Sequence, residues 1–331
     1  VLFSLLALWV GTQGPKHARG PSHLAPERPL HTLPWWLVGL LAGCASGLLL
    51  STSEAMSRDV ASIPLLWAWP LAVFLLSVIV TFDRPALYSR WWALGLMLLG
   101  TLALSTVRIF TEETPLMVSV VTHLVFLFAG CNLCHGELYR GRPASADVTG
   151  FNVAMAAGGA LGGLGVGWLC PRLFDRLVEL PLIMLLTFAV FALSAGREQS
   201  GRRVAAWTGI GVIVVATLVA GVGLFALSNT PTHAQRVVER ARNMHGTLTL
   251  IERDARDGQA ARRLLVDGNT THGMQYLGMP GPPAPTLYYA PVTGIGEAIQ
   301  RAQSARPEGA QIAIIGLGVG TIAAYARPTD T

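Results

Sequence analysis

The sequence predicts a polytopic α-helical membrane domain followed by a small β-domain and the start of an α/β domain. The first observation is composition: of 331 residues, 52% are hydrophobic and only 13% are charged, with a mean hydropathy of +0.49. Soluble globular proteins carry roughly 25% charged residues. The second is placement, because apolar blocks fill residues 1–228 whereas the remainder mixes polar and apolar residues. The third is an apolar run that enters a glycine-rich turn near residue 316. The composition excludes disordered, collagen-like and coiled-coil proteins.

The membrane domain is expected over residues 1–228, because a span needs about 20 mostly apolar residues. The stretch Val1–Gly11 has the character of the second half of an apolar helix and brings the expected total to about eight helices. Seven further stretches qualify: Trp35–Thr52, Ala61–Phe82, Trp91–Val107, Thr114–Cys134, Gly150–Cys170, Val178–Ala195 and Ala205–Ser228. We therefore expect an integral, multi-pass protein of the bacterial inner (plasma) membrane.

The sidedness of the tail stays open. The positive-inside rule places the loops that contain Lys16 and Arg140 in the cytoplasm, which would put the tail on the outer face. Basic residues at the start of the tail, Arg236, Arg240 and Arg242, weaken this assignment. The basic residues lie in short loops rather than in one patch, so we expect no nucleic-acid partner.

The glycine-rich run Gly158–Gly167 resembles a phosphate-binding loop but lies inside a predicted span. It contains overlapping GxxxG pairs, such as Gly159 with Gly163. Small residues at this spacing let two helix backbones approach closely. The run therefore predicts helix packing rather than a ligand site.

Two further groups in the spans have both structural and functional interpretations. Cys131-Asn132-Leu133-Cys134-His135 fits the CxxCH pattern of c-type haem attachment. It closes an apolar span and no second axial ligand is evident, so we expect buried small cysteines and no metal site. His123 lies mid-span and is formally a functional candidate, although a helix-to-helix hydrogen bond is the favoured interpretation.

The tail begins with a small β-rich domain, expected over residues 229–290. The runs Gly246–Glu252 and Arg262–Asp267 have the composition of short strands. Asp267-Gly268 is a hairpin turn signal, and Asn269–Leu277 follows it as the returning strand.

Residues 291–331 have the pattern of a Rossmann-like α/β domain that begins with a helix at Thr293–Ala305. An apolar strand of the buried parallel type, Gln311–Ile315, leads into Gly316–Thr321 and a helix start at Ile322–Ala326. A strand, a glycine turn and a helix N-terminus form a cradle for an anionic or nucleoside ligand. The GxGxG spacing favours an adenosyl cofactor over a dinucleotide, and a purely structural tight turn is the alternative.

Five tail segments together resemble the spermidine synthase family: Arg242–Leu248, Arg263–Gly268, Thr271–Leu277, Tyr288–Tyr289 and Gly316–Thr321. The membrane half resembles the partner of the fused form, a multi-span protein with a synthase-like domain at its end. The stretches that carry this second resemblance are Ile63–Trp67, Pro70–Leu71 and Cys134–Leu138.

The resemblance implies aminopropyl transfer from decarboxylated S-adenosylmethionine to a polyamine acceptor. It implies no tightly bound cofactor, with decarboxylated S-adenosylmethionine or S-adenosylmethionine as co-substrate. The residues that match the cofactor turn are Gly316, Gly318 and Gly320, and those that match the substrate groove are Tyr288 or Tyr289, His272 and Gln275. Asn269-Thr270-Thr271 stands where the family usually has a glutamine, which leaves the amine acceptor open.

The chain is expected to be a piece truncated at both ends, with the catalytic acid unassigned. It ends one predicted helix past the glycine turn, and Asp330 is a poor candidate for that acid. Two alternatives stay open: a transporter-like membrane protein with a vestigial or regulatory adenosyl-binding tail, and an S-adenosylmethionine-dependent methyltransferase. The expected partners are the lipid bilayer and a small polyamine, with homo-oligomerisation through the tail β-domain left open.

Overall fold

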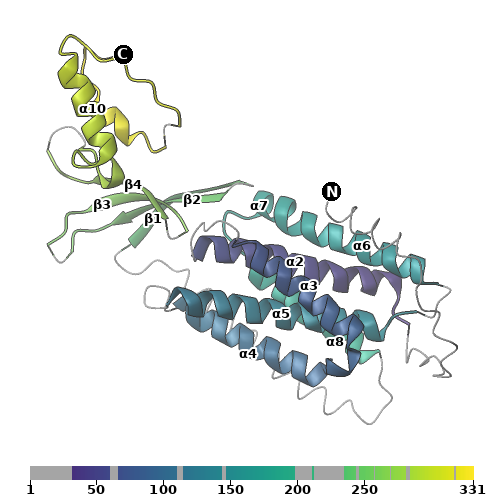
Figure 1. Ribbon diagram of the computed structural model, residues 1–331. Helices are drawn as coiled ribbons and strands as arrows, with labels where there is room; N and C mark the ends of the chain where they lie inside the picture. Colours follow the sequence, from purple (N-terminus) through teal and green to yellow (C-terminus); the bar gives the residue numbers. More distant parts are fainter. Residues whose placement is uncertain are drawn as a thin grey trace.

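The computed structural model has two parts, a helical bundle and a smaller C-terminal unit that adjoins one end of the bundle (Figure 1). The first helix expected from the sequence, Val1–Gly11, lies outside the residues that the structure describes, and so does the last, Ala205–Ser228, apart from the helical residue Gly211. The described residues are 32–59, 66–109, 115–143, 147–197, 211, 235–243, 246–256, 258–268, 270–280, 284–316 and 318–331.

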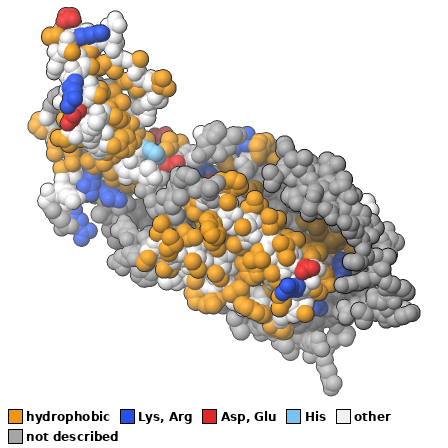
Figure 2. Space-filling view, in the orientation of Figure 1, with side chains coloured by type: hydrophobic (Ala, Val, Ile, Leu, Met, Phe, Trp, Pro, Cys, Tyr) orange, Lys and Arg blue, Asp and Glu red, His pale blue; other side chains and the backbone are white. Residues whose placement is uncertain are grey.

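The bundle contains five helical segments that are long and apolar enough to cross a membrane, together with a shorter apolar helix, within the described residues. On the face that Figure 2 shows, hydrophobic side chains cover most of the described part of the bundle, as expected for helices that contact lipid. The elements are α2 (Trp35–Asp59), α3 (Ala68–Asp83), α4 (Arg90–Ile109), α5 (Leu116–Arg140), α6 (Val148–Leu164), a π-helical turn (Gly165–Leu169), α7 (Cys170–Leu173) and α8 (Glu179–Gly196).

Helix α3 begins later than the span Ala61–Phe82 predicted from hydropathy. Its first residue is Ala68, so Pro70 lies in the first turn. A proline is tolerated there because the N–H groups of a first turn have no partner within the helix. The part of the predicted span before Leu66 lies outside the residues that the structure describes.

Helix α6 packs against α2 through paired glycines. A Cβ atom built on Gly158 would lie 2.1 Å from the carbonyl oxygen of Gly39. One built on Gly162 would lie 2.1 Å from the carbonyl oxygen of Gly43. Only glycine permits this approach of two backbones, so the packing interpretation of the glycine-rich run is confirmed.

The cysteines of the CxxCH pattern are buried inside the bundle, as expected. Cys131 and Cys134 are at most 1% exposed, and His135 is 6% exposed. His135 Nδ1 lies 2.9 Å from Ser77 Oγ, and its ring meets Phe74 edge to face at 5.1 Å. His123 is fully buried, and its Nδ1 lies 2.8 Å from the Ser119 carbonyl oxygen of the same helix.

The C-terminal unit starts with a four-stranded antiparallel sheet in the order β1-β2-β3-β4. The expected strands form, since β2 spans Gly246–Arg253, β3 spans Arg262–Asp267 and β4 spans Thr270–Tyr276. An additional strand, β1 at Gln235–Asn243, pairs with β2 along its whole length and bulges at Val237 to Glu239. Its sequence QRVVERARN lacks the apolar alternation of a half-buried strand, which is why it was missed.

Beyond the sheet, the predicted helix forms as α10, Gly294–Ala305, with the Thr293 hydroxyl accepting a hydrogen bond from the Gly296 amide at its N-cap. The expected strand Gln311–Ile315 does not form. Within the described residues this segment has no flanking strand, and its Ile312 amide instead donates to the Thr331 carbonyl at 2.8 Å. A parallel strand forms only beside other strands that pair with its backbone N–H and C=O groups. Among the described residues no such strand covers this segment, and the Ile315 side chain is fully exposed.

Candidate functional site

A cleft of about 690 Å³ lies between the sheet and the glycine turn. Strands β2, β3 and β4 form one wall, and Val319 to Ala326 form the other. Its lining is mostly apolar, with Arg263, Gln275 and Thr321 as polar side chains. A volume of this size falls within the usual range for small-molecule sites, about 300–1,000 Å³.

The glycine turn has a backbone that other residues would adopt only at a cost. Gly316, Gly318 and Gly320 have φ angles of 83°, 58° and 76°. Side chains with a Cβ are disfavoured in this left-handed region by roughly 1–2 kcal/mol. The expected helix after the turn forms only as a five-residue 3₁₀ segment, Thr321–Tyr325, so the turn lacks the dipole of a longer helix.

Some of the residues predicted from the sequence line the cleft, and others do not. Gly320 and Gln275 line the cleft. Gly316, Gly318, His272, Tyr288 and Tyr289 do not belong to its lining.

The two tyrosines instead hold the glycine turn and β4 together. The Tyr288 hydroxyl donates to the His272 carbonyl at 2.9 Å, and the rings of Tyr288 and Tyr289 lie 4.4 Å apart. A Cβ on Gly318 would lie 3.1 Å from the Tyr289 hydroxyl. Partial burial and the neighbouring Tyr289 raise the pKa of Tyr288, so its phenol stays protonated and can donate. The two tyrosines therefore contact β4 and the glycine turn without lining the cleft.

Gly273 on β4 is a site residue that the sequence analysis gave no separate role. A Cβ at this position would lie 2.3 Å from Val319 of the glycine turn. Glycine inside a strand often marks such a close approach of another segment. A glycine inside the predicted strand was visible in the sequence, and in the structure it marks the contact between β4 and the glycine turn.

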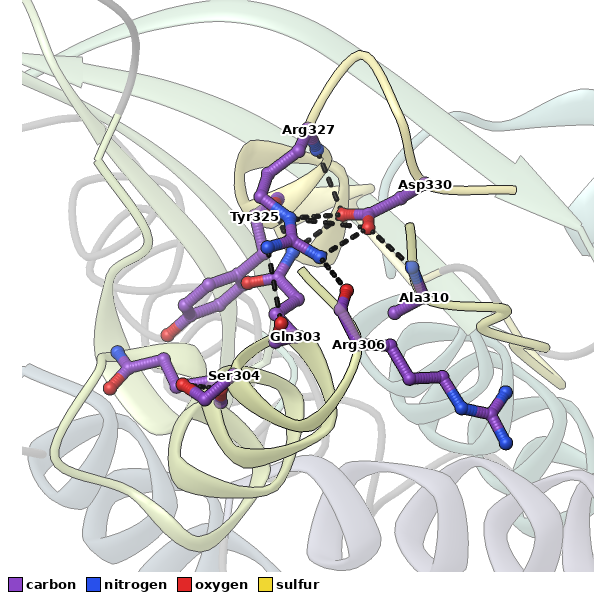
Figure 3. A network of polar contacts seen from close by, with 8 residues as sticks. Gln303, Ser304, Arg306, Ala310, Tyr325, Arg327 and Asp330 are labelled. Atoms are coloured by element: carbon purple, nitrogen blue, oxygen red, sulfur yellow. Dashed lines mark hydrogen bonds and ion pairs between the residues drawn. The ribbon is translucent and has the colours of Figure 1, made fainter. Parts of the chain in front are cut away.

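The segment that holds the glycine turn is fastened to α10 by Asp330 (Figure 3). The Asp330 carboxylate accepts hydrogen bonds from Gln303 Nε2 at 2.6 Å, from the Ala310 amide at 2.9 Å and from Arg327 Nη2 at 2.8 Å. Hydrogen bonds from Arg327 and from the Ala310 backbone hold the pKa of Asp330 well below its usual value. With its oxygens engaged in this way, Asp330 acts as a structural clamp.

A second polar site lies inside the bundle, at the end opposite the sheet. Glu137, 1% exposed, accepts hydrogen bonds from Arg90 Nε at 2.6 Å, Arg90 Nη2 at 2.7 Å, Ser194 Oγ at 2.6 Å and the Tyr88 hydroxyl at 2.9 Å. Burial and the adjacent Glu137 carboxylate raise the pKa of Tyr88, so it remains a donor. The sequence analysis considered only His123 as an ionisable group deep in a span and missed this cluster, because its members come from three separate segments.

A third cluster joins the bundle to the sheet. Arg242 of β1 is 1% exposed and forms an ion pair with Glu179 at the start of α8, and it also lies 3.8 Å from Glu54 of α2. Arg58, near the end of α2, bonds to Glu54 at 3.1 Å and to Asp267 at 3.2 Å. Helices α2 and α8 therefore contact the sheet at two places, at strand β1 through Arg242 and at the β3–β4 hairpin through Asp267.

Comparisons with known proteins provide no independent identification. No protein-family model matches the chain, and neither the curated proteins nor the solved structures include a match to it.

Proposed function

We propose that this chain belongs to a membrane-anchored, spermidine synthase-like protein whose C-terminal unit binds decarboxylated S-adenosylmethionine or S-adenosylmethionine. The observation that supports this proposal is a single cleft lined by both Gly320 and Gln275. Its apolar walls suit an adenine ring and a thioether chain, whereas Gln275, Thr321 and the backbone amides of the turn offer hydrogen bonds to the sugar.

The proposal includes a reaction, the transfer of an aminopropyl group to a polyamine. Such a reaction needs a carboxylate that holds and deprotonates the attacking amine. None of the cleft residues that the structure describes is acidic, and its one charged side chain is Arg263. The proposal therefore assigns the cleft to the adenosyl co-substrate and assigns no catalytic acid.

Calorimetric titration of the full chain in nanodiscs tests the proposal with decarboxylated S-adenosylmethionine, S-adenosylmethionine and 5′-methylthioadenosine. Ala324→Trp would fill the cleft, and Ala305→Trp at the exposed end of α10 is the matched control. We expect binding that Ala324→Trp abolishes and Ala305→Trp preserves. Tighter binding of the decarboxylated compound supports aminopropyl transfer, and tighter binding of S-adenosylmethionine supports methyl transfer. Equal binding by both variants would reject the cleft.

A transporter-like role is a second candidate because a buried ion pair lies at each end of the bundle. Arg90 and Glu137 meet at one end, and Arg242 and Glu179 at the other. Ionisable residues within membrane segments commonly mark transport pathways. Uptake of labelled spermidine by proteoliposomes, lost in Glu137→Gln, would favour this role, and no uptake by the unmodified chain would reject it for this substrate.

A further inference from the structure

We propose that an elongated groove on the bundle binds a membrane lipid whose head group carries a primary ammonium. The groove has a volume of about 540 Å³ and runs between α2, α6 and α8. Its lining is apolar along most of its length, from Trp35 and Trp36 at the start of α2 to Leu182 and Leu186 of α8. Glu179 is the one charged residue among the described residues that line it.

The groove faces the surroundings of the bundle rather than its core. Several of its lining side chains remain open to the outside although they are large and apolar: Trp35, Trp36, Leu161, Leu169, Leu182 and Leu186 are between 42% and 69% exposed. The described residues include five helices long and apolar enough to cross a membrane, and an apolar surface on such helices is expected to contact lipids. An acyl chain therefore matches the long apolar part of the groove.

The carboxylate at the end of the groove has an unused acceptor. Glu179 is 3% exposed, and Arg242 bonds to its Oε1. Its Oε2 is buried and has no hydrogen-bond partner among the described residues. A buried acceptor without a partner costs free energy, which an ammonium donor would recover.

Glu179 belongs to a set of ion-paired side chains in which carboxylates outnumber guanidinium groups. The ion-paired side chains at this junction comprise three carboxylates and two guanidinium groups, namely Glu54, Glu179, Asp267, Arg58 and Arg242. The set therefore carries one net negative charge. Glu179 is the first residue of α8, an apolar helix long enough to span a membrane, so it stands at the level where lipid head groups lie.

Native mass spectrometry of the full chain, incubated with equimolar phosphatidylethanolamine, phosphatidylcholine and phosphatidylglycerol of identical acyl chains, tests this inference. Phosphatidylcholine is the matched ligand, because its quaternary ammonium keeps the charge but has no N–H donor. We expect retention of phosphatidylethanolamine over phosphatidylcholine by roughly tenfold or more, as for one hydrogen bond to a charged group. Equal retention of these two lipids, or preferential retention of phosphatidylglycerol, would overturn the assignment.

Two matched variants locate the site. Ala157 lines the groove, whereas its neighbour Ala156 is exposed and lies outside the lining. Ala157→Trp should lower lipid retention at least tenfold, and Ala156→Trp should leave it unchanged. Glu179→Gln, which removes the charge, should abolish the preference for phosphatidylethanolamine. Equal behaviour of the two tryptophan variants, or an unchanged preference in Glu179→Gln, would refute the proposed site.

Discussion

Replacing Arg90 by methionine tests whether the buried Glu137 cluster holds the bundle together. The substitution puts an apolar side chain of similar length in place of Arg90 and removes the hydrogen bonds to Glu137 from Nε at 2.6 Å and Nη2 at 2.7 Å. The Glu137 carboxylate, 1% exposed, would then keep its bonds from Tyr88 and Ser194 but lose the positive charge that compensates it.

The expected loss follows from the burial of the pair. Removing one partner of a buried ion pair costs about 3–5 kcal/mol, because the remaining charge is left without compensation in a medium of low dielectric constant. Removing a single donor in Tyr88→Phe or Ser194→Ala should cost less, about 1.5–3 kcal/mol, as for one hydrogen bond to a charged group. The double variant Arg90→Met/Glu137→Met should lose less than the sum of the two single variants, because it leaves no unpaired charge.

Unfolding of the full chain by SDS in mixed micelles, followed by circular dichroism, measures these differences. Arg84→Met is the control, since the Arg84–Asp83 pair is 3.8 Å long and both side chains are at least 73% exposed. An exposed pair contributes roughly 0–1 kcal/mol. If Arg90→Met destabilised the chain no more than Arg84→Met, or if the double variant lost the full sum, the cluster would not stabilise the bundle as argued.

Three further predictions concern other parts of the molecule. Gly158→Leu should separate α6 from α2 and sharply lower the SDS concentration at which half of the chain unfolds. Gly167→Leu is the control, because nothing lies within 4 Å of a Cβ added there, and it should leave this midpoint nearly unchanged. Equal effects of the two variants would contradict the glycine packing. Gly320→Ala should weaken ligand binding in the cleft and cost about 1–2 kcal/mol because φ is 76°, and calorimetry that finds unchanged binding would argue against the turn as a ligand wall. Asp330 has a lowered pKa, so its contribution to stability is present above its ordinary pKa of 3.8 and is lost as pH falls toward the folded value. Thermal unfolding across this range should show a smaller decline with falling pH in Asp330→Asn than in the unmodified chain, and parallel curves would refute the clamp.

The apolar helices were predictable because each carries its own signal in one continuous stretch. Hydropathy alone located α2, α4, α5, α6 and α8, and β-propensity with the Asp267-Gly268 turn located the β3–β4 hairpin. Glycine spacing predicted close helix packing, and Gly158 and Gly162 confirm it.

Features that depend on distant partners could not be predicted in this way. Strand β1 is polar and is identified only by its pairing with β2. The segment Gln311–Ile315 has the composition of a buried strand, yet strand formation also depends on neighbours. On α10, the apolar Ile295 is 42% exposed, whereas the polar Gln303 is buried and bonds to Tyr325 and Asp330.

The candidate sites show the same limit. Gly320 was named from the glycine motif and Gln275 from the family resemblance; both line the cleft, and their binding roles stay predictions. The buried ion pair of Glu137 with Arg90 joins residues 47 positions apart, and that of Arg242 with Glu179 joins residues 63 apart. No local spacing rule connects such residues, so only the packing of the helices brings them together.

The junction between bundle and sheet combines two contacts that respond differently to ionic strength. Charges open to solvent are screened over about 8 Å at physiological salt, whereas buried pairs are screened much less. The Arg58 and Asp267 side chains are 12% and 30% exposed, but Arg242 and Glu179 are 1% and 3% exposed. Rising salt is therefore expected to weaken the Arg58–Asp267 contact before it weakens the Arg242–Glu179 pair, so the two attachments of the sheet differ in their dependence on ionic strength.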